Sequence, residues 1–352
     1  MGSLFGGLGM KTQVGFRNSV VNGSHAACEE RGAVHADQPD RARMILAFES
    51  LLPSFLLILF GFGLSRSPLL PAALWEGVER LNYYVLFPAL LFVTLARADL
   101  ASAPIGPMAG AMVLAILLVA GAMTASRRWW MSLPGVDGRA YSSHFQGAIR
   151  WQTSVALALS ATLYGREGLA LGAIGVAAMI PLLNLLSVTV VASYGAETPP
   201  SARALARELA RNPLILSVLA GAALNASGLE LYGPVIETVD LLGRGALGVG
   251  LLLVGAGLAP ATLRLRLDVG VVVLVKLVLM PMLMIGFATL FGVHGVALGV
   301  VAISSAVPTA SNAYLLARRL GGDAPLMSAI ITVQTVVAFA TLPATLWLIG
   351  AA

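Results

Sequence analysis

Charged residues are scarce in this 352-residue sequence. Asp, Glu, Lys and Arg together make up 11% of it, whereas hydrophobic residues make up 58%. A soluble domain carries about 25% charged residues, so the composition excludes a soluble globular protein. The mean hydropathy of +0.86 comes from long apolar runs along the chain, not from one signal-peptide stretch. The sequence therefore predicts an all-α polytopic membrane protein.

Cysteine occurs once, at Cys28, which excludes an internal disulfide framework and a cysteine-based metal site. The nucleotide-binding pattern GxxxxGK[ST] is missing, so we do not expect ATP to drive the protein directly. HExxH and GxSxG are missing too, and His294 stands alone in a short loop, so we expect neither an enzyme nor a metal site. We expect no cofactor beyond a coupling ion, for which H⁺ and Na⁺ both stay open.

Residues 1–43 are polar, carry charges of both signs and show no apolar periodicity. They also lack the charged start, apolar core and small-residue cleavage site of a signal peptide. We expect this tail to have no fixed structure, and we assign it no function. The hydrophobic sequence begins at Met44.

After Met44 the apolar runs predict ten membrane-spanning helices. Glycine is abundant, with 38 residues, as suits helices that pack closely in lipid through small side chains. The predicted spans cover residues 44–64, 72–96, 105–126, 144–164, 168–194, 213–228, 235–259, 268–291, 295–319 and 325–349.

Arginine is divided unevenly between the loops of this scheme. The loops after odd-numbered spans hold eleven arginines, and those after even-numbered spans hold two. By the positive-inside rule the odd loops face the cytoplasm, which puts both termini outside it. We therefore expect a multi-pass protein of the cell (inner) membrane. The odd-loop arginines are Arg66, Arg127, Arg128, Arg139, Arg203, Arg207, Arg211, Arg264, Arg266, Arg318 and Arg319, and the even-loop ones are Arg97 and Arg166.

The ten predicted spans divide into two halves of five. Residues 44–195 form the first five-helix repeat, a basic cytoplasmic loop follows over 196–212, and residues 213–352 form the second repeat. Because five is odd, the halves enter the membrane with opposite orientations, as in the inverted repeats of many secondary transporters. In such transporters the substrate site lies where discontinuous helices at matching positions of the two repeats meet.

The ninth span departs most from an ordinary membrane helix. Polar residues between Ser304 and Asn312 replace the Leu, Ile and Val that lipid favours, and Pro308 removes one helix hydrogen bond. Broken backbone at membrane depth is tolerated only where protein buries it or where it lines a watery cavity. We predict that freed amides and a helix end face an anionic carboxylate here. The candidate site residues of this span are Ser305, Pro308, Thr309, Ser311 and Asn312.

The counterpart of this span in the first repeat is span four, in which Arg150, Gln152, Thr153 and Ser154 lie together. We predict that Gln152, Thr153 and Ser154 contact the substrate. The Gln152 amide suits reversible binding of a carboxylate because it is a donor without a fixed charge. Arg150 lies at the start of the span, where snorkelling to the interface also explains it.

Two further charged residues are candidates. Lys276 lies about eight residues into span eight, where a charge needs either an interface or a partner, so snorkelling and a functional role both stay open. Arg244 follows Asp240 by four residues, which predicts an ion pair on one helix face. If Arg244 instead reached the cavity, its guanidinium would bind a carboxylate through two hydrogen bonds.

Five stretches of the chain, in this order, resemble the auxin efflux carrier family of the bile acid/auxin carrier superfamily. The bacterial malonate-transporter-like members are the most similar in character, and the resemblance covers nearly everything from Met44 onward. The stretches are LNYYVLFPALLF (81–92), LYGREGLALGAIGVAAMIPLLNLLSV (163–188), LGRGALGVGLLLVGAGL (242–258), VKLVLMP (275–281) and VPTASNAYLLARRLGGD (307–323).

This resemblance implies ten helices in two inverted five-helix repeats, in which spans four and nine are unwound and cross near the centre. It also implies that the protein transports organic anions. It also makes Asn82, within the first stretch, a candidate site residue. One feature departs from the family, which often has Asn-x-Gly and a nearby proline in span four. Here the chain reads Trp151-Gln152-Thr153-Ser154 with no proline before Pro181, so the unwinding of span four stays open.

We interpret the chain as a secondary transporter of the efflux-carrier type that moves a mono- or dicarboxylate by alternating access. A sodium-coupled organic anion symporter of the bile-acid type is the alternative within transport. A membrane anion receptor that moves nothing is the alternative from another class. The expected partners are the anion and the lipid bilayer, with no nucleic acid, and a homodimer stays open beside a monomer.

Overall fold

The computed structural model describes residues 40–100, 103–195, 201, 203, 206–207, 210–259 and 266–350. The predicted polar tail lies outside these residues, except that the first helix begins at Asp40. Most of the predicted basic loop, 196–212, also lies outside them. Residues from Met44 to Ala352 form one compact unit.

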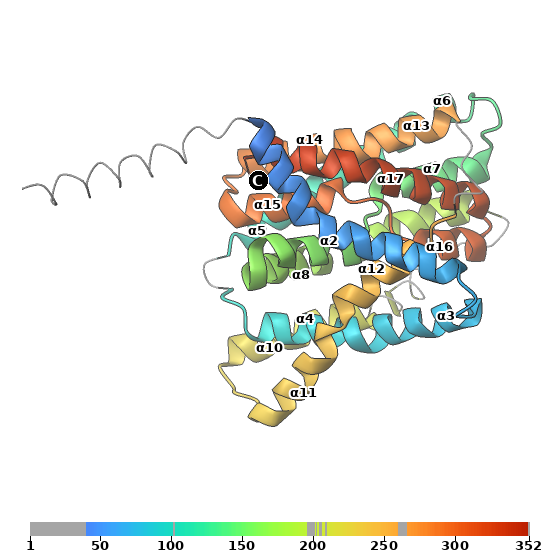
Figure 1. Ribbon diagram of the computed structural model, residues 1–352. Coiled ribbons are helices and arrows are strands. Elements are labelled where there is room, and N and C mark those ends of the chain that lie inside the picture. The colour runs from blue at the N-terminus through green and yellow to red at the C-terminus, as the bar shows by residue number, and fades with distance from the viewer. Residues whose placement is uncertain are drawn as a thin grey trace, which may run out of the picture. The chain divides into compact units, whose positions relative to one another are not determined.

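Every regular element in the described part of the chain is a helix, as the composition predicted. Two of them, η1 and η3, are short π-helical segments within longer helical runs (Figure 1). The elements are α2 (Asp40–Arg66), α3 (Ala72–Leu81), η1 (Asn82–Leu86), α4 (Phe87–Ala96), α5 (Ile105–Ala125), α6 (Arg127–Trp130), α7 (Gly138–Ile149), α8 (Thr153–Tyr194), α10 (Pro213–Ser227), α11 (Gly233–Arg244), α12 (Ala246–Ala256), α13 (Leu267–Leu274), η3 (Val275–Leu279), α14 (Met280–Leu290), α15 (Gly295–Ala306), α16 (Asn312–Leu320) and α17 (Ala324–Leu348).

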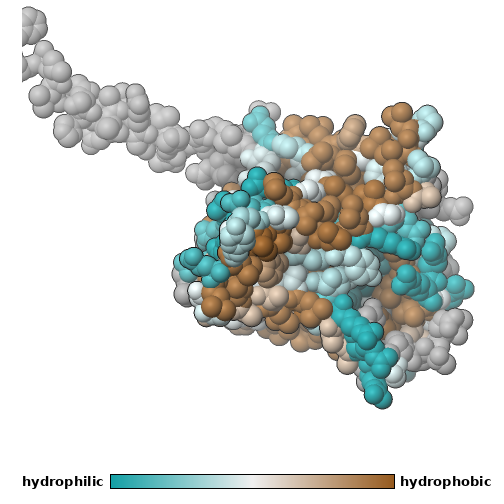
Figure 2. Space-filling model, turned by 90° about the horizontal axis from the view of Figure 1, so that it is seen from below, coloured by the Kyte–Doolittle hydropathy of each residue, from teal (hydrophilic) through white to brown (hydrophobic). Residues whose placement is uncertain are grey.

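Seven helical stretches in the described residues are long and apolar enough to cross a membrane, and α10 and α15 are shorter apolar helices. Large hydrophobic side chains are exposed on the outside: Leu69, Leu267 and Leu290 have exposed fractions of 76%, 79% and 75%. Figure 2 shows hydrophobic residues over much of one face. Such a surface is suited to lipid and not to water. The predicted all-helical membrane protein is confirmed.

Glycines let several helices approach to backbone contact. A Cβ atom on Gly61 of α2 would collide with the backbone of Leu252 in α12, and one on Gly255 would collide with the backbone of Ile58. On α11, Gly243 faces the backbone of Leu90 in α4 in the same way. Lipid supplies no hydrophobic drive between helices, so close van der Waals contact of this kind holds them together.

The loops that follow odd-numbered predicted spans contact one another at one end of the compact unit. Each of three arginines from these loops donates to a backbone oxygen of a different odd loop. The hydrogen bonds run from Arg66 Nη2 to Leu258 O (2.7 Å), from Arg139 Nε to Gly321 O (2.7 Å) and from Arg266 Nη2 to Gly135 O (3.2 Å).

The loops after even-numbered spans contact one another elsewhere. Asn225, at the end of α10, donates through Nδ2 to Ala96 O at 3.1 Å and to Ala98 O at 2.8 Å, both at the end of α4. Each of these hydrogen bonds therefore joins loops that follow predicted spans of the same parity.

Two helical runs are interrupted in the middle. The first stops at Ile149 and resumes at Thr153, so Arg150, Trp151 and Gln152 are not helical. The second stops at Ala306 and resumes at Asn312, around Pro308. In Figure 1, the label of α15 lies toward the left of the molecule and those of α7 and α16 toward the right. The unwinding of span four, which the sequence left open, is observed without a proline.

A kink inside α8 marks the end of predicted span four. Gly165 has φ 59° and ψ −140°, a conformation that side chains with a Cβ rarely adopt. The chain turns there between the predicted ranges 144–164 and 168–194.

Candidate functional site

The two breaks are joined directly through their backbones. The N–H of Gln152, in the first break, donates to the carbonyl oxygen of Pro308, in the second, at 2.8 Å. The Gln152 side chain makes a second link, in which Nε2 donates to Ser311 Oγ at 2.9 Å. Gln152 is 7% exposed and Pro308 is buried. Two segments that the sequence predicted separately therefore form one crossing.

A buried glutamine from a third helix also bridges the breaks. Gln334 of α17 has no exposed surface. Its Oε1 accepts from the N–H of Thr309 at 2.8 Å, and its Nε2 donates to the carbonyl oxygen of Gly147 at 2.9 Å. Thr309 Oγ1 donates to the same Gly147 oxygen at 2.9 Å. In unbroken helices these backbone groups would bond to residues four positions away, so the three contacts replace the bonds that the breaks remove.

Lys276 satisfies another backbone group at the second break. The carbonyl of Ser305 would accept from Thr309 N in an unbroken helix, but Thr309 N is taken by Gln334. Lys276 Nζ instead donates to this oxygen at 2.8 Å. The side chain is 1% exposed, so it does not snorkel to an interface. It lies in η3, and none of the ion pairs among the described residues includes it.

Arg150 occupies the equivalent place at the first break. It is the C-cap residue of α7 and is 6% exposed, so it is buried rather than snorkelling. One Nη2 atom donates to Asn312 Oδ1 at 3.1 Å and to Asn184 Oδ1 at 3.3 Å. Asn312 is the first residue of α16, so Arg150 connects the end of one half-helix to the start of another.

The four helix ends at the crossing have opposite partial charges. The carbonyl ends of α7 and α15 are partially negative, and each has a cationic side chain, Arg150 or Lys276, beside it. The amide ends of α8 and α16 begin at Thr153 and Asn312 and are partially positive, which favours an anion. Cationic side chains and helix N-termini at one place can bind a carboxylate.

The remaining candidates of the two breaks lie around this centre. Thr153 and Ser154 are half-buried in the first turn of α8, and Ser154 packs against Gly250 of α12, where an added Cβ would lie 2.9 Å from the serine Cβ. Asn312 is exposed. The Ser305 hydroxyl donates to Ala302 O at 2.7 Å within its own helix, so only its carbonyl contributes to the crossing.

Two predicted site residues are not brought to the crossing by any described contact. Arg244 donates to Asp240 Oδ2 at 3.0 and 2.7 Å, and its side chain is 71% exposed. The predicted ion pair is thus present. Asn82 lies in η1 and is 4% exposed, and its Oδ1 has no hydrogen-bond partner among the described residues.

Gln334 was missed by the sequence reasoning, although it is the residue that bonds to both breaks. Its only signal is that of an amide within an apolar run, TVQTVV, and nothing near it in the chain indicates a partner. Asn184 of α8 also contributes here, because Arg150 Nη2 donates to its Oδ1 as well as to that of Asn312.

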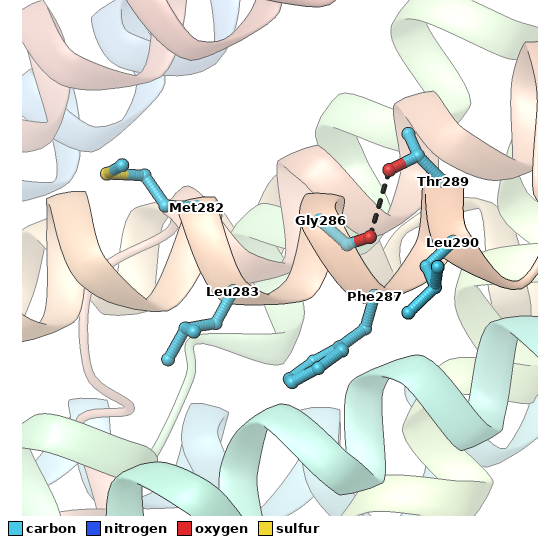
Figure 3. A pocket seen from close by; sticks show the side chains of 6 residues that line it. All are labelled: Met282, Leu283, Gly286, Phe287, Thr289 and Leu290. Carbon is cyan, nitrogen blue, oxygen red and sulfur yellow. Dashed lines mark hydrogen bonds between the residues drawn. The ribbon is translucent and has the colours of Figure 1, made fainter.

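A groove on the surface lies away from the crossing. It has a volume of about 490 Å³ and runs along α14 beside Met282, Leu283, Gly286, Phe287, Thr289 and Leu290 (Figure 3). The polar side chain among these residues is satisfied locally, because Thr289 Oγ1 donates to Gly286 O at 2.9 Å. Apolar side chains exposed on a membrane helix fit lipid better than a charged substrate.

Comparisons with known proteins point to membrane transport. Residues 177–348 match the family described as "Membrane transport protein". The chain is also 27% identical over 324 residues to a protein of Rhizobium meliloti (strain 1021) named "Putative malonate transporter", an alignment that covers 85% of this chain and 94% of that protein. The family match includes the second break, Lys276 and Gln334, and the relative aligns over most of the chain. The second half of the chain thus resembles this membrane transport family, and both matches indicate a transporter and not an enzyme.

Proposed function

We propose that the protein moves a small organic anion, a mono- or dicarboxylate, across the cell membrane by alternating access, with the anion held at the crossing of the two breaks. The observation that carries this proposal is the pair of broken helices joined from Gln152 to Pro308, with Arg150 and Lys276 beside them. The name of the relative makes malonate the first substrate to test.

The chemistry of the crossing suits binding that must be reversed. The Gln152 amide and the Ser311 hydroxyl at present bond to each other, and either can turn to a carboxylate oxygen without leaving a bare charge. Arg150 is held by two neutral amide oxygens, which a carboxylate can displace in favour of a charge-assisted pair. Neutral partners that exchange in this way allow the anion both to bind and to leave.

We further infer ten membrane crossings in two inverted five-helix repeats. The two breaks fall in the fourth and ninth predicted spans, the matching positions of the two halves. The contacts of odd loops with odd loops support this arrangement, in which each intervening pair of helices returns to the same end. In this arrangement one group of helices moves against the other and exposes the crossing to either side of the membrane.

The arginine-rich end is inferred to face the cytoplasm, and labelling of single cysteines tests this orientation. In a background with Cys28→Ser, Ser201→Cys is expected to react with an impermeant maleimide only from the cytoplasmic side. Gly233→Cys is expected to react only from outside, since the two positions follow spans of different parity and both are exposed. The reverse pattern would place the termini in the cytoplasm.

Truncation of the two amides at the crossing tests the substrate site. Gln152→Ala or Asn312→Ala is expected to lower malonate uptake into proteoliposomes by about 10- to 100-fold, as for loss of one hydrogen bond to a charged group. Thr162→Val is the control, because its hydroxyl donates only to Ala158 O in the same helix. Uptake by both amide variants at the wild-type rate, with normal expression, would remove the crossing as the site.

A sodium-coupled symporter is the alternative within transport, but the freed carbonyl oxygens at the crossing already accept hydrogen bonds from the protein. Carbonyl oxygens freed by broken helices are the groups that bind Na⁺ in such proteins. Here the oxygens of Gly147, Ser305 and Pro308 are all occupied by donors of the protein. We therefore expect uptake that does not depend on Na⁺. A receptor would instead bind malonate with saturation and show no flux.

A further inference from the structure

A buried histidine and a buried aspartate lie in contact outside the crossing. His144, on α7, has no exposed surface, and Asp268, in the first turn of α13, is 5% exposed. Nε2 of the imidazole lies 2.9 Å from Oδ2 of the carboxylate. The two residues are 124 positions apart, so the contact joins two separate helices, α7 and α13, and is not a contact between adjacent turns of one helix.

The imidazole of His144 is buried, but its two ring nitrogens are poorly provided with hydrogen bonds. Neither ring nitrogen has a well-aligned hydrogen bond among the described residues, although Nε2 is close to the carboxylate. Buried polar atoms are nearly always hydrogen-bonded, so an exception calls for an explanation. A neutral imidazole can direct one N–H toward Asp268, whereas an imidazolium adds a second donor, on Nδ1, that has no acceptor in this arrangement.

The pair is connected to the surface through Arg266. This guanidinium donates to both oxygens of Asp268, at 3.0 and 2.7 Å, and its side chain is 34% exposed. On the other side, the Trp130 ring lies over the imidazole with a centroid separation of 5.2 Å and a tilt of 30°. The carboxylate thus lies between an accessible cation and an enclosed imidazole, and a proton can reach the ring by way of Asp268.

The helix that contributes Asp268 contacts both broken helices. Asp268 touches His144 on α7, the first half of one broken helix. Eight residues later in the same helical run, Lys276 bonds to Ser305, at the end of the half-helix α15. A change in the packing of α7 on α13 can therefore affect both breaks, because one continuous helical run, α13 followed by η3, contacts both broken helices.

We propose that His144 and Asp268 form a proton-binding site whose occupancy controls the attachment of α7 to α13. The deprotonated imidazole fits the arrangement described here, and a bound proton favours a second arrangement in which the Nδ1 donor finds an acceptor. The other charges that act on His144 are Arg266 and, ahead of α17, Asp323. Lys276 on η3 points to Ser305 instead, and α5 contains no ionisable residue.

The fluorescence of Trp130 reports proton binding directly, because an imidazolium beside an indole quenches it more than an imidazole does. The test titrates wild-type protein in liposomes between about pH 4 and pH 9, a window that brackets ordinary histidine titration. A decrease in emission on acidification is expected, and Trp130→Phe or His144→Gln should remove it. His294→Gln, outside this site, should keep it. An emission change that is identical in wild type and His144→Gln would overturn the proposal.

Hydrogen–deuterium exchange tests the structural consequence. Glutamine keeps an amide donor for Asp268 but does not titrate, so His144→Gln serves as the matched reference at each pH. We expect α7 of the wild type to exchange about tenfold faster than the reference at the acid end and equally at the basic end. If His144→Gln does not fold, Asp268→Asn should show fast exchange at every pH. Equal exchange of wild type and either variant throughout would refute control by the pair, and neither readout depends on transport.

Discussion

Gln334→Leu is expected to destabilise the protein by about 2–4 kcal/mol and to abolish most of the proposed transport of malonate. Leucine has nearly the same volume but leaves the buried N–H of Thr309 without an acceptor, which costs about 1–3 kcal/mol. Loss of the bond to Gly147 adds about 1 kcal/mol, since Thr309 Oγ1 still donates to that oxygen. The change is measured as the shift of the unfolding midpoint in detergent and as the initial rate of uptake.

The matched control lies next to Gln334 on the same helix. Thr335 is 2% exposed, and its hydroxyl donates to Ile331 O at 2.8 Å within α17, so Thr335→Val removes a buried polar group that touches neither break. We expect this variant to stay near wild type in both measurements. If Gln334→Leu unfolds at the wild-type midpoint, the bridge between the breaks does not hold them together.

Lys276→Met is expected to have the opposite effects: stability is retained, and the proposed transport of malonate falls by about 10- to 100-fold. A buried charge that is replaced by an apolar group of similar shape removes a desolvation penalty, which offsets the lost bond to Ser305. The same change removes a cation from beside the break, where a hydrogen bond to a charged group contributes about 1.5–3 kcal/mol. Stability and uptake are measured as for Gln334→Leu.

Leu277→Met is the control for this substitution, because Leu277 is the next residue of η3 and is 2% exposed. It introduces the same side chain without changing charge, and uptake should remain close to wild type. Full activity of Lys276→Met would show that the lysine only caps α15. A large loss of stability in Lys276→Met would show that its bond to Ser305 outweighs the desolvation penalty of the charge.

The two substitutions separate two kinds of support at the crossing. Gln334 replaces neutral hydrogen bonds that the breaks remove, so we expect its loss to lower mainly the free energy of unfolding. Lys276 brings a basic side chain into a site without a carboxylate partner among the described ion pairs, so we expect its loss to lower the affinity for an anion. A transporter needs both, because the broken backbone must be stable before it can bind a substrate.

Features that depend on neighbouring residues could be read from the sequence. Apolar runs located the helices to within a few residues, with the longest shift at the start of the fourth span, where α7 begins at Gly138 and not at residue 144. Pro308 indicated the second break, because proline lacks the N–H that a helix interior needs. The spacing of Asp240 and Arg244 indicated their ion pair, which is a contact between adjacent turns.

Features that depend on distant residues could not be read in this way. The first break has no proline, and Gln152 leaves the helix because Pro308, 156 positions later, accepts its N–H. Gln334 and the His144–Asp268 contact are likewise polar groups whose partners lie far along the chain. Arg150 was explained by snorkelling, but only its packing showed that it is buried.

By itself, the sequence determined that the chain is a helical membrane protein and that the ninth span is interrupted. These properties follow from hydropathy and one proline, both of which act locally. Only the tertiary structure decided that the fourth span is interrupted as well and that the two interruptions satisfy each other. The physical reason is that a freed backbone group in a membrane must find a partner, and that partner can come from anywhere in the chain.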